Sequence, residues 1–237
     1  MIHVLLALAG LALTSPAPAP ASASLPASGL KASQTSGAKN EGEAKRSADA
    51  MRVVDWVAAS GDNASLPYII VDKKAATLFL YDAKGKKRGD VPILIGVATG
   101  DEATPGVGSK NLAEIGPAER TTPAGRFLAK FGLAAGRQKV LWVDYATSVA
   151  LHPIPKGNRK ERRRERMLSP TIEDNRITFG CINVPVTFYS KSVRPLFQRK
   201  GGYIYVLPDT KPLEAVFPRL RVQPLLGRID IQDSQKG

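Results

Sequence analysis

The chain has 237 residues, of which 43% are hydrophobic and 23% are charged. These proportions are close to the globular average, so they exclude a collagen-like, disulfide-stapled or wholly disordered chain. This length suits one folded domain with additional segments at its ends. The formal charge of +13 indicates an anionic partner, and charge alone leaves nucleic acid, an anionic membrane surface and the acidic bacterial wall open.

Residues 2–13 form an apolar stretch that is too short to span a bilayer, and a run rich in Ala, Ser and Pro follows it. The pattern predicts a signal peptide over residues 1–23, although no Lys or Arg precedes the apolar stretch. We therefore expect an exported protein of the periplasm or cell envelope. An uncleaved N-terminal membrane tether and a misassigned start codon are the alternatives. Export argues against nucleic acid as a partner, and we expect a monomer.

Residues 24–63 are predicted to be a flexible linker that contains a short helix. From Ser24 to Asp49 the chain has almost no large apolar residue, so it cannot offset the entropy lost on ordering. Residues 50–59 have the pattern of an amphipathic helix that carries Trp56 and packs on the outside of the domain.

Residues 64–210 are predicted to fold into one mostly β domain, a β-sandwich or open barrel with one or two short helices. Short β-rich segments separated by Gly and Pro turns indicate hairpin-linked antiparallel strands. The expected strands cover residues 68–72, 76–82, 91–100, 125–131, 140–152, 176–185 and 202–208. A helix is expected at 185–199, kinked or shortened by Pro195. Residues 211–237 are predicted to be a C-terminal tail that is ordered at first and then frayed.

Cys181 is the only cysteine, which excludes an intrachain disulfide, and two histidines are too few for a usual four-ligand zinc site. We expect no metal and no cofactor. Cys181 directly follows Gly180 at the end of a strand, where its sulfur can project into a cleft. Gly180 lets the backbone turn so that successive N–H groups can form an oxyanion hole for acyl transfer.

A nucleophilic cysteine needs a neighbouring base, and His152 is the only histidine outside the leader. It ends a strand-like segment, and the backbone carbonyl of Pro153 is a candidate partner for its second ring nitrogen. The bland alternative is that Cys181 is a small buried core residue and His152 a satisfied structural one. Spacing alone does not choose between these interpretations.

The segment from Tyr68 to Pro208 resembles the L,D-transpeptidase catalytic domain, also called the YkuD domain. The resemblance rests on the hairpin YIIVDKKAATLFLYDAKGK, the GVATG and TPAGRF segments, the strand that ends at His152, and the signature TFGCIN at 178–183. It implies that Cys181 is the acyl-accepting nucleophile and His152 the proton donor and acceptor. It further implies a backbone oxyanion hole near Gly180 and Cys181, with Thr178 and Asn183 as supporting residues.

Two features depart from the family pattern. Phe179 stands where many members have a second histidine. His152 and Cys181 lie 29 positions apart, more than is usual in the family, because a basic insertion separates them. Residues 156–166 hold seven basic and two acidic side chains. They form either a solvated helix or a cationic lid that binds carboxylates beside the cleft.

The resemblance implies a peptidoglycan L,D-transpeptidase that passes a donor tetrapeptide stem from a cysteine thioester to an amine acceptor. An L,D-carboxypeptidase or murein hydrolase of the same fold is one alternative, and a non-catalytic cationic wall-binding protein is another. Arg176 is a candidate for binding a substrate carboxylate, and pairing with Asp174 is its structural alternative.

Overall fold

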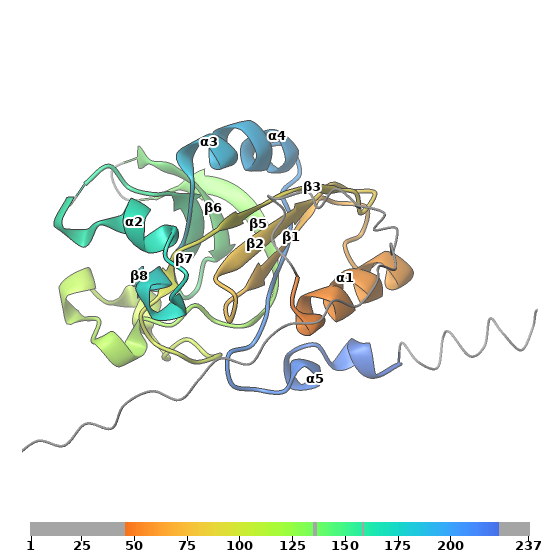
Figure 1. Ribbon diagram of the computed structural model, residues 1–237, viewed down its shortest axis with the longest axis horizontal. Helices are drawn as coiled ribbons and strands as arrows, with labels where there is room; N and C mark the ends of the chain where they lie inside the picture. The colour runs from red at the N-terminus through yellow and green to blue at the C-terminus, as the bar shows by residue number, and fades with distance from the viewer. Residues whose placement is uncertain (1–45, 135–136, 158, 223–237) are drawn as a thin grey trace, which may run out of the picture. The chain divides into compact units, whose positions relative to one another are not determined.

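The computed structural model describes residues 46–134, 137–157 and 159–222 (Figure 1). The predicted signal peptide, most of the predicted linker and the end of the predicted tail lie outside these residues. Within them, no helix combines the length and the apolarity that crossing a membrane would need.

The protein is mostly β, as predicted, and its main element is one eight-stranded sheet in the order β3-β2-β1-β10-β5-β6-β7-β9. Its strands are β1 (Tyr68–Asp72), β2 (Thr77–Tyr81), β3 (Lys87–Pro92), β5 (Gly125–Leu133), β6 (Lys139–Asp144), β7 (Val149–Pro153), β9 (Ile182–Val184) and β10 (Gly202–Val206). The short strands β4 (Ile95–Gly96) and β8 (Arg176–Thr178) form a separate pair.

The antiparallel hairpins predicted for the first strands are present, because β2 pairs antiparallel with both β1 and β3, but three other strand pairs are parallel. β1 pairs with β10, β7 with β9 and β4 with β8 in parallel. Parallel neighbours need a long crossover connection, and alternation within one strand carries no information about its partner's direction. The pair β7 and β9 matters most for the site, because it brings the two halves of the chemistry together.

Three predicted strands are broken in the structure, and the first of them, residues 91–100, contains only the end of β3 and the short β4. Residues 140–152 form β6 and β7 with a turn between them, in which Asp144 accepts hydrogen bonds from the N–H of Ala146 and the hydroxyl of Thr147. Residues 176–185 form β8 and β9, separated at Gly180 and Cys181. In residues 140–152 and 176–185 the sequence pattern of a strand continues through the break, because β-branched and apolar residues flank it on both sides.

Five α-helical segments occur in the described residues: α1 is the helix predicted within the linker, and the other four are short, as predicted. They are α1 (Ala48–Ser60), α2 (Arg163–Met167), α3 (Val186–Phe188), α4 (Arg194–Phe197) and α5 (Leu213–Val216). The 3-10 turns are Val107–Ser109, Leu112–Glu114, Pro117–Glu119, Arg159–Glu161, Ile172–Asn175 and Pro218–Val222. A π-helical turn at Tyr189–Val193 joins α3 to α4. Pro195 sits in the first turn of α4, where its missing N–H is not needed, so the helix continues past it.

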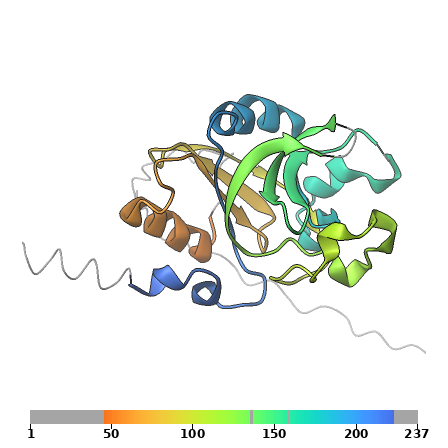
Figure 2. The ribbon, with the colours of Figure 1, turned by 180° about the vertical axis from the view of Figure 1, so that it is seen from behind.

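Strands β1, β2 and β10 are largely buried on both faces, because helices cover this part of the sheet from two sides (Figures 1 and 2). Ile69 and Val71 of β1 pack with residues of the α3–α4 helix, whereas Tyr68 and Ile70 pack with α1 and α5. The period of two in a strand places alternate side chains in the two cores. All five residues of β1 are therefore buried, which explains its continuous apolar sequence.

Helix α1 packs against the sheet through one face. Ala50, Val53, Trp56 and Val57 are buried at helical spacing, and the Trp56 ring contacts Tyr205 edge-on at 5.9 Å between centroids. The Ser47 side chain caps the start of α1 by accepting the N–H of Ala50 at 3.1 Å, and Gly61 ends the helix in a left-handed conformation. The helix therefore belongs to the second core.

Lys73 follows β1 directly, and its side chain is fully buried. Its Nζ forms ion pairs with Asp101 at 3.0 Å and Asp209 at 3.2 Å. It also donates to the carbonyl oxygens of Gly100 at 2.5 Å and Thr122 at 2.9 Å. An ammonium group without water requires such a complete set of acceptors. Lys73 thus joins three segments that are far apart in the chain.

The Asp101 carboxylate is satisfied mainly by backbone donors. It accepts the N–H groups of Asp209 at 2.5 Å, Thr210 at 2.9 Å and Lys211 at 2.7 Å, and the Thr210 hydroxyl at 2.7 Å. Burial raises the pKa of Asp101, but these hydrogen bonds outweigh burial and hold its pKa well below the ordinary value. Asp101 is therefore ionised in the folded protein at neutral pH.

Replacing Asp101 with Asn should destabilise the protein by about 3–5 kcal/mol at pH 7, because it leaves the buried Lys73 ammonium without one counterion. Since the folded-state pKa of Asp101 is depressed, its contribution is present above the ordinary carboxyl pKa of about 4 and lost as pH falls below it. Urea denaturation of wild type and D101N at pH 7 and pH 3 would measure both effects. Glu102→Gln, which changes a neighbouring exposed carboxylate, is the control; equal losses in both variants would contradict the argument.

Candidate active site

Cys181 lies in the break between β8 and β9, and its side chain is partly exposed. Gly180, immediately before it, has a φ of +121°, and a Cβ atom there would come within 2.7 Å of the carbonyl oxygen of Thr121. Only glycine fits this backbone position without a shift. The predicted reason for Gly180, a sharp turn that leaves the sulfur at a cleft, agrees with this geometry.

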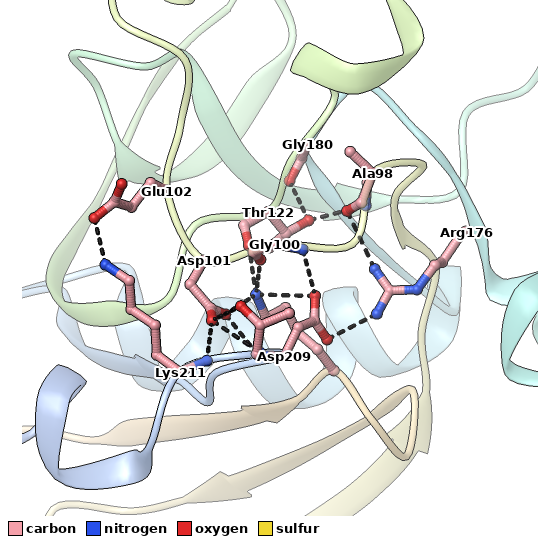
Figure 3. Close-up of polar contacts among 12 residues, drawn as sticks. Ala98, Gly100, Asp101, Glu102, Thr122, Arg176, Gly180, Asp209 and Lys211 are labelled. Atoms are coloured by element: carbon pink, nitrogen blue, oxygen red, sulfur yellow. Dashed lines mark hydrogen bonds and ion pairs between the residues drawn. The ribbon is translucent and has the colours of Figure 1, made fainter.

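The Gly180–Cys181 backbone is held from two sides. Within the motif, the Thr178 hydroxyl donates to the carbonyl of Cys181 at 2.6 Å and accepts the N–H of Gly180 at 3.1 Å. From outside, the Thr122 hydroxyl donates to the carbonyl of Gly180 at 2.8 Å and accepts the N–H of Gly96 at 2.9 Å. The carbonyl oxygen of Thr122 also accepts a hydrogen bond from Lys73. Thr122 therefore connects the buried charge cluster to Gly180, the residue before Cys181 (Figure 3).

One amide predicted for the oxyanion hole is already engaged. The N–H of Gly180 donates to Thr178, as described above. An oxyanion bound at Gly180 would therefore have to replace the hydroxyl as the acceptor. The predicted role of Thr178 as a support is consistent with its two hydrogen bonds.

The parallel pairing of β7 and β9 determines which side chains share a face. His152 is in register with Asn183, and Leu151 is in register with Ile182. Leu151 and Ile182 are fully buried in the core. Because strand residues alternate between faces, His152 and Asn183 lie together on the opposite face, and Cys181 starts the β9 side of that face. His152 and Cys181 thus belong to the same face of neighbouring strands, with Cys181 two register positions before the residue that pairs with His152.

The hydrogen bonds around His152 determine its tautomer. A guanidinium only donates, so Asn183 contacts Arg163 Nη1 through its oxygen, at 2.7 Å. The Asn183 Nδ2 therefore faces His152 Nε2, at 3.2 Å, and Nε2 must accept. The proton of the neutral ring is then on Nδ1, which donates to the carbonyl of Pro153 at 2.8 Å. The hydrogen bond predicted for Pro153 is present.

The sulfur and the imidazole do not bond to each other in this state. The contact of Cys181 Sγ is the carbonyl oxygen of Ser148 at 3.8 Å, and both ring nitrogens of His152 have the other partners just described. Proton transfer between Cys181 and His152 therefore requires a change of side-chain contacts. Catalytic hydrogen bonds commonly tighten only when substrate is bound.

Electrostatics favours the uncharged forms of both groups. Burial raises the pKa of the Cys181 thiol, although the backbone N–H of Ala150 and the charge of Arg163 oppose this shift. Burial lowers the pKa of His152; the Pro153 carbonyl acts in the opposite direction and Arg163 lowers it further. The resting pair at neutral pH is thus a thiol beside a neutral imidazole, and no thiolate–imidazolium pair is formed.

Arg176 is held in an ion pair. Its guanidinium contacts the Asp209 carboxylate at 2.8 Å and the carbonyl oxygen of Ala98 at 3.3 Å (Figure 3). The predicted pairing with Asp174 is wrong, since Asp174 instead accepts from the Ser169 hydroxyl at 2.6 Å. Binding of a substrate carboxylate by Arg176 stays a prediction and would compete with Asp209.

The basic insertion folds into a 3-10 turn at Arg159–Glu161 and the helix α2, and it lines a groove of about 920 Å³ together with residues 185–187. The groove lining includes Ile154, two residues after His152 in the chain, but neither His152 nor Cys181. Its charged lining residues are Lys156, Arg159, Glu161, Arg162, Arg163, Arg164 and Glu165. The insertion is therefore neither a freely solvated helix nor remote from the site.

Three contributions to the site escaped the sequence analysis. Arg163 reaches His152 only through Asn183, and nothing distinguishes it among the neighbouring arginines of the insertion. Lys73 has the sequence signature of a turn residue after a strand. Arg120 stacks over the ring of Phe179, the residue before Gly180, at 4.0 Å, which places a cation beside the turn. Each contribution depends on a contact between distant segments.

Among the described residues, no group of three or more His, Cys, Asp or Glu side chains is arranged to hold a metal ion.

No model of a protein family matches this chain, and no curated protein sequence matches it. Solved structures do match. The helical cell shape determining protein Pgp2 from Campylobacter jejuni is 17% identical with a TM-score of 0.41, and the match covers 62% of this chain and 49% of that one.

The catalytic domain of the Enterococcus faecium L,D-transpeptidase is 21% identical with a TM-score of 0.32, and the match covers 59% of this chain and 95% of that domain. An L,D-transpeptidase from Xylanimonas cellulosilytica is 14% identical with a TM-score of 0.35, with 60% of each chain covered. The chain thus spans about half the length of Pgp2. Several of the solved structures that this chain resembles are L,D-transpeptidases.

Proposed function

We propose that this protein is a cysteine acyltransferase of the L,D-transpeptidase type that acts on peptide stems of the bacterial wall. The observation that carries the proposal is that Cys181, just before β9, and His152 of the neighbouring parallel strand β7 belong to the same face of the sheet, with the lone pair of the imidazole on Nε2. Cys181 is partly exposed as a residue, and the ring orientation is fixed by the Pro153 carbonyl.

In the first step, His152 Nε2 takes the thiol proton and the Cys181 sulfur attacks a carbonyl carbon of a donor tetrapeptide stem. A carbon–sulfur bond forms, and backbone N–H groups near Cys181 hold the oxyanion. The carbon–nitrogen bond to the terminal D-residue then breaks. The imidazolium returns the proton to the leaving amine, so the products are a thioester and a free D-amino acid.

In the second step, an amine of another stem attacks the thioester carbonyl. His152 removes a proton from the attacking nitrogen, a new amide bond forms, and the sulfur leaves and regains its proton. Water in place of the amine gives a carboxylate, which would make the protein an L,D-carboxypeptidase. The two outcomes differ only in which acceptor reaches the thioester. The protein would act outside the cytoplasmic membrane, where its substrate is.

The positive charge of the groove favours the binding of an anionic substrate or wall polymer near His152. It holds five basic and two acidic side chains. Carboxylates of peptide stems would form charge-assisted hydrogen bonds there. The same groove also supports the rival proposal, a wall-binding protein without catalysis.

Replacing Cys181 with Ala should abolish covalent labelling by a carbapenem, because no other cysteine exists. His152→Ala should slow the labelling by about 10²- to 10⁴-fold, the usual contribution of a general base. Mass spectrometry of the intact chain measures the added mass over time. Labelling of the Cys181→Ala variant, or an unchanged rate in His152→Ala, would contradict the assigned roles.

The pH dependence of thiol reactivity follows from the burial of Cys181. Because burial raises the pKa of this thiol, the alkylation rate with iodoacetamide should reach its midpoint at a higher pH than in the same chain unfolded in urea. The unfolded chain is the matched control, since it carries the same single cysteine. A folded-state midpoint below that of the unfolded chain would show a preformed thiolate and sink this description of the resting state.

Sedimentation with purified peptidoglycan separates catalysis from binding. If the protein is an enzyme that uses the groove for substrate, Cys181→Ala should keep salt-sensitive binding and lose 3-3 crosslink formation in a muropeptide digest. Binding without any crosslinking or trimming by the wild type would favour the wall-binding protein. Accumulation of trimmed stems alone would favour the carboxypeptidase.

A further inference from the structure

The hydrogen-bond chain that begins at Pro153 and passes through His152 and Asn183 ends at Arg163, in the basic insertion. We propose that Arg163 is a positioning residue that locks the Asn183 amide in the orientation that keeps His152 neutral. His152 then gains a proton only when this amide turns or Arg163 withdraws. The inference rests on the proposed function, in which His152 is the base.

The lock follows from which groups donate. Arg163 donates to Asn183 Oδ1, so a turned amide would bring the donor Nδ2 against the donor guanidinium. In the locked orientation Nδ2 faces His152 Nε2 at 3.2 Å, which suits a lone pair there. An imidazolium carries a proton on both nitrogens, so its Nε2–H would oppose the Nδ2 donor. The fixed amide therefore opposes protonation of His152.

Burial makes this arrangement effective. Asn183 is 1% exposed and the Arg163 side chain 14% exposed, so neither exchanges its partner for water at low cost. Glu161 holds the Arg163 guanidinium from the other side, with Nε to Oε2 at 2.5 Å. The charged or titratable groups that face His152 are thus Cys181 from the turn before β9, and Arg163 with its partner Glu161 from the insertion.

Because of Arg163, the insertion contributes a positioning contact as well as positive charge. Arg163 lines the groove and at the same time contacts the residue that contacts the base. A carboxylate that enters the groove and draws Arg163 away would free the amide to turn and accept the Nε2–H of an imidazolium. Binding of a carboxylate in the groove and protonation of His152 are therefore coupled through the Arg163 side chain.

The His152 titration, followed by NMR of the imidazole nitrogens in the ¹⁵N-labelled full chain, tests the proposal. The chain has two histidines, and His3→Gln assigns the signals. Arg163→Gln should raise the proton affinity of His152 by about tenfold, or about one pH unit. Arg164→Gln removes the same charge from an exposed position of the same helix and should change the affinity less than about twofold. Equal effects of the two variants would overturn the proposal.

A double-mutant cycle with Asn183→Ala shows whether Arg163 acts through the amide. Asn183→Ala alone should raise the proton affinity of His152, because the donor to Nε2 is lost. Arg163→Gln should then add little in the Asn183→Ala background, and Arg163→Lys, which keeps a charge and a donor, should titrate close to wild type. The same shift from Arg163→Gln in both backgrounds, or no shift from Asn183→Ala, would overturn the proposal even if Arg163→Gln fails to fold.

The titration is measured without substrate, so the two proposals fail separately. Carbapenem labelling of Cys181 with no Arg163-dependent shift would reject the lock and leave the acyltransferase standing. A shift of the predicted size without labelling would reject the acyltransferase and leave the Arg163 lock standing.

Discussion

The buried ammonium of Lys73 is the constraint on which the site depends. A charge without water requires a full shell of acceptors, and this one is supplied by segments near residues 100, 122 and 209. Once these segments are gathered around Lys73, the Thr122 hydroxyl is fixed against the carbonyl of Gly180. The turn that presents Cys181 is thereby supported from the interior, by groups that never contact a substrate.

The second support comes from strand pairing. β7 and β9 run parallel, and their register places His152 beside Asn183, two residues after Cys181 on the same face. A shift of one residue would move His152 into the core, in place of Leu151, and move Leu151 to the site. Leu151 and Ile182, which alternate with His152 and Asn183, therefore fix the register and, with it, the positions of His152 and Asn183 at the site.

The resting site is held in an uncharged state, and the insertion contributes to this. Arg163 provides a cation near both Cys181 and His152, which favours a thiolate but disfavours an imidazolium. Direct contact between sulfur and imidazole is replaced by contacts with Ser148 and Asn183. In such a state the thiol reacts slowly with small electrophiles, because the thiolate is the nucleophile.

Local periodicity and the scarcity of a residue type are enough to predict most strand segments, the helix around Trp56, the turn at Gly180, and Cys181 with His152 as a candidate pair. The fold added the parallel pairing, the breaks at 145–148 and 180–181, the partner of Arg176 and the contacts of Lys73 and Arg163. These could not be predicted because they depend on contacts between segments distant in sequence. A lysine after a strand and an arginine among arginines have the same local pattern whether they face solvent or a buried carboxylate or amide.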